Sequence, residues 1–215
     1  MLRLVGANLN YSSWTMRAWL ALEAAGADYR LHDVGLKTRP GWKERILEFS
    51  GAGNVPILVD GPSSIHESLA ICEYVAELHP DAQLWPADAR LRARGRAIAC
   101  EMLGGFHAIR TYMPSNLRAR AARTPSADGL DAEIARVQDI WSASMQAGGP
   151  FLLGELSIAD FMYMPVVGRF RTYGVSLGDE ARRYSDAVLA HPLVQKLEGL
   201  AAETDPIGEY DAALG

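Results

Sequence analysis

The chain has 215 residues, of which 49% are apolar and 22% charged, a composition typical of a soluble globule with one large core or two smaller ones. The net charge of -5 supplies no basic stripe for phosphates, and the locally cationic run 116–123 is predicted to be a solvated helix face, so we expect no nucleic-acid partner. No apolar run approaches the roughly 18 residues of a membrane span, and the first residues form a strand pattern rather than an export signal, so we expect a cytoplasmic protein without membrane contact.

Strand and helix signals alternate through the first eighty residues. A strand is predicted over Leu2 to Ala7, and a helix follows from Ser12 to Ala25, where Gly26 is placed to end it. A second strand is predicted over 29–34, and a short helix after residue 40. A hairpin that turns at "DGP" is predicted over 55–67, and a helix follows it over 68–78. This βαβαββα order predicts an α/β domain over residues 1–79.

Strand signals fade beyond a linker, residues 79–89, that contains two prolines. The helices predicted from there on cover 88–110, 130–145, 158–173, 179–189 and 193–203. The fold class is therefore α/β followed by all-α, with a helical-bundle domain over residues 87–215. The closing stretch "DPIGEYDAALG" is poor in apolar residues, so we expect it to be loosely held.

The stretch "NYSSWTMRAW" falls at the first turn from strand to helix. Thioredoxin-like redox proteins carry Cys-x-x-Cys at such a turn, whereas here the four positions run from Ser12 to Thr15. Serine forms no disulfide, so thiol–disulfide exchange with protein sulfur is excluded at this turn. A hydroxyl here can cap the helix or donate a hydrogen bond to a bound thiolate, and the two roles are compatible.

Two further motifs lie in the first half. In "NVPILVDG", Pro56 begins a strand, and in a thioredoxin-like unit this position holds a cis proline whose preceding residue, Val55, can pair with an extended peptide. In "HESLAICEYV", Glu67 and Ser68 begin a helix, where they can cap it or bind the ammonium and carboxylate groups of a ligand such as the γ-glutamyl end of glutathione. The purely structural interpretation of each motif stays open.

The motif "FLLGELSIADFMYMPVV" in the second half has a structural meaning. Ser157 and Asp160 form a capping box with Asp in place of the usual Glu or Gln, and Leu156 and Phe161 are placed as a hydrophobic staple. We expect this motif to start a buried helix and assign no catalytic role to Asp160.

These four motifs, in this order, resemble those of the cytosolic glutathione transferase family. The serine-containing turn is similar to that of bacterial-type and zeta-like members, and the resemblance covers nearly the whole chain. The resemblance implies a thioredoxin-like domain that binds glutathione as co-substrate and a helical domain that contributes most of the pocket for an electrophile. It implies no metal, in keeping with the lack of metal-ligand spacing at Cys72 and Cys100. Members are commonly homodimers, so a homodimer is expected.

The resemblance also assigns residues. Ser12, five positions before Arg17, is the implied catalytic residue, with Ser13 as its rival and Arg17 as support for the turn or a source of positive potential. The implied glutathione contacts are Asn54, Val55, Pro56, Glu67 and Ser68, although relatives often carry a longer polar or basic residue at the position of Asn54. The candidates for the electrophile pocket are Tyr11, Trp14, Phe106, Arg110, Tyr112 and Met113.

The implied activity is addition of the glutathione thiolate to small electrophiles, or substitution on them. One alternative is a zeta-like cis–trans isomerase, as of maleylacetoacetate, in which glutathione adds transiently and leaves. An alternative from another class is a non-catalytic member that binds glutathione or another ligand, or interacts with proteins.

Overall fold

The computed structural model describes residues 1–144 and 148–212, and it confirms the predicted order βαβαββα in the first half. Its sheet has the strand order β2-β1-β3-β4. Strand β1 (Leu2–Gly6) pairs parallel with β2 (Tyr29–Asp33) and antiparallel with β3 (Ile57–Asp60), which in turn pairs antiparallel with β4 (Ser63–His66). The helices are α1 (Ser13–Ala24), α2 (Trp42–Leu47) and α3 (Ser68–Leu78). This is a thioredoxin-like arrangement.

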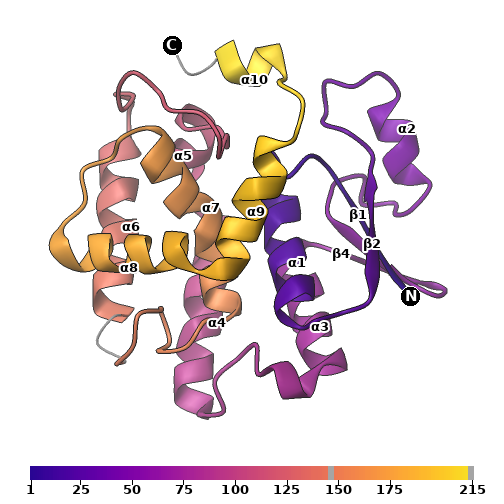
Figure 1. The fold of residues 1–215 in the computed structure, drawn as a ribbon, viewed down its shortest axis with the longest axis horizontal. Helices are drawn as coiled ribbons and strands as arrows, with labels where there is room; N and C mark the ends of the chain where they lie inside the picture. The colour runs from indigo at the N-terminus through magenta and orange to yellow at the C-terminus, as the bar shows by residue number, and fades with distance from the viewer. Residues whose placement is uncertain (145–147, 213–215) are drawn as a thin grey trace.

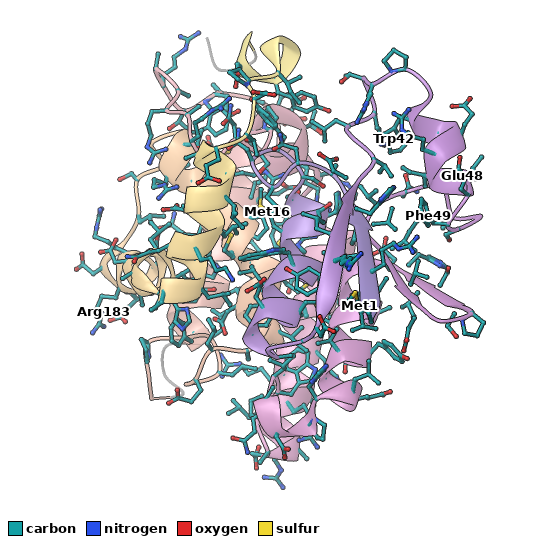
Figure 2. The ribbon with its side chains drawn as sticks, turned by 45° about the vertical axis from the view of Figure 1, so that its right-hand side comes forward. Met1, Met16, Trp42, Glu48, Phe49 and Arg183 are labelled. Carbon is teal, nitrogen blue, oxygen red and sulfur yellow. The ribbon has the colours of Figure 1, made fainter. Side chains whose placement is uncertain are left out.

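The two faces of the sheet bury different side chains because successive residues of a strand point in opposite directions. Leu4 and its partner Leu58 pack into the large core with α1 and α3, whereas Val5 and its partner Ile57 pack with Trp42 on the α2 side. Figure 2 shows Met16 of α1 in the interior and Trp42 on the far side of the sheet beside α2. The sheet is therefore covered on both faces.

The second half is helical, as predicted, and lies beside the first with α1 and α3 between it and the sheet (Figure 1). After the short 3-10 turn at Pro80–Ala82, its helices are α4 (Ala89–Gly104), α5 (His107–Tyr112), α6 (Leu130–Ser144), α7 (Ile158–Thr172), α8 (Asp179–Ala190), α9 (Pro192–Ala202) and α10 (Gly208–Ala212). Helix α7 contacts α1, α3, α4 and α8 and is buried over almost its whole length. Together with α9, which also contacts α1, it joins the two halves.

The single helix predicted over 88–110 is wrong, because the chain forms α4 and α5 with a break between them. Gly105 is extended, and Phe106 has a left-handed backbone with φ of 59°. A side chain at Gly105 would lie 2.8 Å from the Glu101 carbonyl oxygen, so this close approach requires glycine.

The last residue of the helix predicted over 130–145, Met145, lies outside the described residues. The division into domains at 1–79 and 87–215 stays a prediction. Within residues 1–144 and 148–212, every helix is too short or too polar to cross a membrane.

Candidate active site

A cavity of about 550 Å³ lies where the turn before α1 meets the helical half. Residues from both halves of the chain form its wall. Of the residues singled out from the sequence, those that line it are Tyr11, Ser12, Ser13, Trp14, Asn54, Val55, Glu67 and Arg110. The turn, the cis-proline segment and the start of α3 therefore meet at one site.

Ser12 caps helix α1. Its Oγ accepts a hydrogen bond from the Thr15 N–H at 3.3 Å and lies 2.8 Å from Thr15 Oγ1, which accepts in turn from the Ala7 N–H at 3.1 Å. Gly6 makes this approach possible, because a side chain there would lie 2.4 Å from the Thr15 methyl group. The cap predicted from the sequence is present, and it also fixes Ser12 at the cavity wall.

Ser13, the first residue of α1, is held from the other half of the molecule. The buried guanidinium of Arg169, on α7, donates from Nη2 to Ser13 Oγ at 3.1 Å. The same guanidinium donates from Nε to the Met113 carbonyl oxygen at 2.8 Å. Both serine hydroxyls thus have fixed partners while lining the cavity.

The cis-proline segment and the start of α3 form the neighbouring wall. The Val55–Pro56 peptide bond is cis, and Val55 lines the cavity while Pro56 is buried beside it. Glu67 has φ of 75° and ψ of 128°, a conformation that non-glycine residues rarely adopt and that is often found at functional sites. The buried Ser68 Oγ has no hydrogen-bond partner among the described residues. An unpaired buried hydroxyl at a helix start is a ready acceptor or donor for a ligand.

Two arginines lie against the indole of Trp14, and a third lies near them. The guanidinium carbon of Arg17 lies 4.5 Å from the ring centroid and that of Arg110 lies 4.7 Å from it, while Arg169 is close enough to lower the pKa of Arg17 by repulsion. Burial, followed by the charges of Arg110 and Arg169, lowers the pKa of Arg17 to about 9. Over residues 1–144 and 148–212, the structure pairs none of the three with a carboxylate in a salt bridge. The cavity is therefore positively charged on this side.

Arg17 lies behind Trp14 rather than among the residues that line the cavity. It is 1% exposed, its Nε donates to the Met162 carbonyl oxygen at 3.1 Å, and its Nη1 has no partner within the described part of the chain. This geometry joins α1 to α7, and it also keeps an uncompensated charge near the turn. The structure is thus compatible with both roles suggested for Arg17.

The segment before the C-terminus closes one side of the cavity. Tyr210 of α10 lines the cavity, and its ring centroid lies 5.3 Å from that of Tyr11. Asp211 accepts hydrogen bonds from Tyr11 Oη at 2.9 Å, from Asn116 Nδ2 at 2.7 Å and from Arg118 Nη2 at 3.4 Å. The expectation that this stretch is loosely held is wrong for the described residues up to Asp211, because polar bonds hold it where apolar packing does not.

Three residues suggested for the electrophile pocket lie elsewhere. Phe106 packs against Tyr163 in the core, Met113 is fully buried, and Tyr112 is 45% exposed. Nine residues that the sequence reasoning missed also line the cavity, and the five of them with polar or aromatic side chains are Lys37, Trp42, Ser115, Arg169 and Tyr210. Only long-range packing brings these five to the turn, and no local pattern marks them.

Comparison with known proteins agrees with this geometry. Residues 11–78 match the family described as "Glutathione S-transferase, N-terminal domain". A "Probable maleylacetoacetate isomerase" of Caenorhabditis elegans is 29% identical over 172 residues, covering 77% of each chain. "Glutathione S-transferase L1" of Arabidopsis thaliana is 28% identical over 171 residues, covering 76% of this chain and 66% of the relative.

Among solved structures, a glutathione transferase homologue from Burkholderia with bound glutathione has the same fold. The TM-score is 0.71 at 21% identity, over 94% of this chain and 98% of that one. These comparisons confirm the resemblance to the glutathione transferase family that was seen in the sequence: residues 11–78 match its N-terminal domain, and the relatives are named as transferases and an isomerase.

Proposed function

We propose that this protein binds glutathione in the cavity and transfers small electrophilic groups to its sulfur. The observation that carries the proposal is the meeting of two serine hydroxyls at the start of α1 with Val55 and Glu67 at the adjoining wall. A helix N-terminus and hydroxyl donors stabilise a thiolate placed beside them. With glutathione bound, its sulfur supplies the nucleophile, and the side chains of this protein hold and ionise it.

The walls offer a partner for each end of the tripeptide. In this proposal the backbone of Val55 pairs with the cysteinyl unit, Glu67 binds the ammonium group, and the helix start at Ser68 binds the γ-glutamyl carboxylate. Lys37 lines the cavity and would receive the glycyl carboxylate. We assign Asn54 a lesser role because its amide donates to the Ala52 carbonyl oxygen at 3.3 Å.

Ionising the thiol of bound glutathione at neutral pH requires only a modest free energy. A free thiol with a pKa near ~8.5 is about 3% ionised at pH 7, and lowering that pKa by ~2 takes roughly 2.7 kcal/mol. A hydroxyl donor together with a helix N-terminus can supply about that much. Because nucleophilicity falls with pKa, the net gain in rate is only severalfold, so most of the acceleration must come from holding the electrophile beside the sulfur.

Calorimetry with glutathione tests the proposal, using the unmutated protein, Ser68→Ala, and Ser64→Ala as a control on exposed β4. We expect saturable binding that Ser68→Ala weakens and Ser64→Ala leaves unchanged. Turnover with an activated chloroarene, followed as thioether formation, tests the transfer step. Failure to bind glutathione would overturn the proposal, and binding without turnover of any electrophile would favour the non-catalytic alternative.

A second candidate function is zeta-like cis–trans isomerisation of a carboxylate-bearing substrate such as maleylacetoacetate. Arg110 and Arg169 line the cavity without a carboxylate partner in the described part of the chain, and the buried Ser115 Oγ at the same wall has no hydrogen-bond partner there. These groups suit an anionic second substrate. Glutathione-dependent isomerisation of maleylacetoacetate at a rate above that of chloroarene transfer would favour this candidate.

The proposal includes a cytoplasmic homodimer, as is common among relatives. Sedimentation equilibrium distinguishes a dimer from a monomer of 23.4 kDa.

A further inference from the structure

Arg169 connects α7 of the helical half directly to the turn before α1. Arg169 is 6% exposed, and its guanidinium is held by the Met113 carbonyl oxygen at 2.8 Å, the Pro165 carbonyl oxygen at 3.4 Å and Ser13 Oγ at 3.1 Å. With partners on Nε, Nη1 and Nη2, the planar group is fixed in orientation. A charged donor is thus aimed at one of the two active-site serines across 156 residues of sequence.

We propose that Arg169 is a positioning residue that acts through Ser13, fixing and polarising its hydroxyl so that Ser13 donates to the thiolate of bound glutathione. This inference rests on the proposed function and adds the residue that sets the acidity of the thiol. It also makes Ser13 a catalytic donor in its own right rather than only a rival of Ser12.

The hydroxyl of Ser13 keeps a hydrogen to donate while it is bound to Arg169. A serine Oγ has one hydrogen to donate and two lone pairs to accept with, and an arginine can only donate. The bond from Arg169 therefore occupies a lone pair of Ser13 and leaves its hydrogen free. No acceptor for that hydrogen lies within bonding distance in residues 1–144 and 148–212, and Ser13 lines the cavity. The hydrogen is thus available to a ligand.

The charge of Arg169 strengthens that donor. A hydrogen bond from a cation draws electron density from the hydroxyl oxygen, and bonds linked in this way reinforce one another in a low-dielectric interior. Burial and the charge of Arg110 lower the pKa of Arg169 to about 10, so the guanidinium is protonated at neutral pH. The chain of donors runs from Arg169 through Ser13 into the cavity.

Ser12, unlike Ser13, is held by uncharged groups. Its Oγ is bound to the Thr15 N–H and Thr15 Oγ1, which carry no net charge. The two serines are therefore fixed by separate partners on separate helices, α1 for Ser12 and α7 for Ser13. Removing Arg169 should weaken the Ser13 donor and leave the Ser12 cap intact.

Other charged groups act on the same cavity and have to be kept constant in a test. They are Arg17 behind Trp14, Arg110 from α5, Lys37 from the loop before α2 and Glu67 before α3. The phenol of Tyr173, beyond the end of α7, also influences Arg169 electrostatically. A double-mutant cycle leaves all of these unchanged and isolates the path through Ser13.

The readout is the apparent pKa of the bound thiol, from thiolate absorbance over a pH series. The variants are Ser13→Ala, Arg169→Met, their double mutant and Arg169→Lys. We expect Ser13→Ala and Arg169→Met each to raise that pKa by about 1, because a change of this size corresponds to the loss of roughly one hydrogen bond. The double mutant should be no worse than either single change, and Arg169→Lys, which keeps the charge, should recover part of the effect.

The control is Arg171→Met, on the same helix, because Arg171 pairs with Glu198 and does not line the cavity. It should leave the pKa of the thiol unchanged. Additive effects of Ser13→Ala and Arg169→Met would mean that Arg169 does not act through Ser13, and no effect of Arg169→Met would remove its role; either result overturns the inference. Should Arg169→Met fail to fold, the cycle of Ser13→Ala with Arg169→Lys decides on the same criterion. An unmutated protein that binds glutathione without lowering its pKa would instead overturn the proposed function.

Discussion

Tyr11 and Asp211 are 200 residues apart in the chain, yet the Tyr11 hydroxyl donates to the Asp211 carboxylate at 2.9 Å. The same phenol oxygen accepts from the Ile207 N–H at 3.0 Å and from Arg118 Nη2 at 2.8 Å. One side chain of the active-site turn thus fastens the segment that carries Tyr210 to the cavity wall.

Tyr11→Phe should loosen this segment because it removes the oxygen that makes all three bonds. Two of the three bonds reach residues of the segment and each contributes about 1 kcal/mol, so local opening should become roughly tenfold to a hundredfold more frequent. Amide hydrogen exchange of residues 205–211, followed by mass spectrometry, measures the change. Strand β1 should keep its protection, and Tyr112→Phe at an exposed position is the control. Unchanged exchange at 205–211 would show that other contacts hold the segment.

Local patterns in the sequence predicted the first half well. Alternation and turn residues marked the strands, "DGP" marked the hairpin, and the serines before α1 marked its cap. The resemblance implied that Val55 and Glu67 contact glutathione, and both residues line the cavity because the βαβαββα order brings them to the same end of the strands as the turn before α1.

Apart from Arg110, the part of the site that comes from the helical half was not predicted from the sequence. Arg169 and Ser115 look like ordinary helix and loop residues, and only packing of α7 against α1 brings Arg169 to Ser13. Phe106 and Met113 were chosen for their apolar character, but such residues serve the core as readily as a pocket. The break at Gly105 also escaped prediction, because glycine within a helical pattern is often tolerated.

Lys37→Ala should weaken glutathione binding about tenfold by removing a charge-assisted bond to the glycyl carboxylate. Calorimetry should show the loss with glutathione but not with γ-glutamylcysteine, which lacks the glycyl unit. Lys43→Ala is the matched control: both ammonium groups lie about 6 Å from the Trp42 ring centroid, but Lys43 donates to the Gly53 carbonyl oxygen and does not line the cavity. Equal loss with both ligands would argue against this assignment of Lys37.

Ser157→Ala should lower the free energy of unfolding by about 1 kcal/mol, the usual contribution of an N-cap. The Asp160 carboxylate accepts from the Ser157 N–H at 2.8 Å and from its hydroxyl at 3.0 Å at the start of the buried α7. Urea denaturation measures the change, with Ser176→Ala at an exposed position as the control. Equal stability of the two variants would contradict the role of this cap.

The contribution of His191 to stability should be lost as the pH drops below about 6.5. His191 caps α9 through Nδ1, which accepts from the Leu193 N–H at 3.2 Å only when the ring is neutral, and burial lowers its pKa in the folded protein. The unfolded chain therefore takes up the proton first as the pH falls, so the contribution is complete above the ordinary pKa and is lost as the pH falls through the folded one. His191→Asn keeps a capping side chain without this titration, so its melting temperature should vary less between pH 7 and pH 5. An identical pH profile for both proteins would remove His191 from the explanation.

The central claim is that this chain holds glutathione with its sulfur ionised. Difference absorbance of the bound thiol, titrated with pH in the unmutated protein and in the Ser12→Ala, Ser13→Ala double variant, tests it most directly. We predict a thiolate band at neutral pH, with an apparent pKa well below the ~8.5 of a free thiol, that the double variant loses. Bound glutathione that titrates like the free thiol in the unmutated protein would contradict the claim.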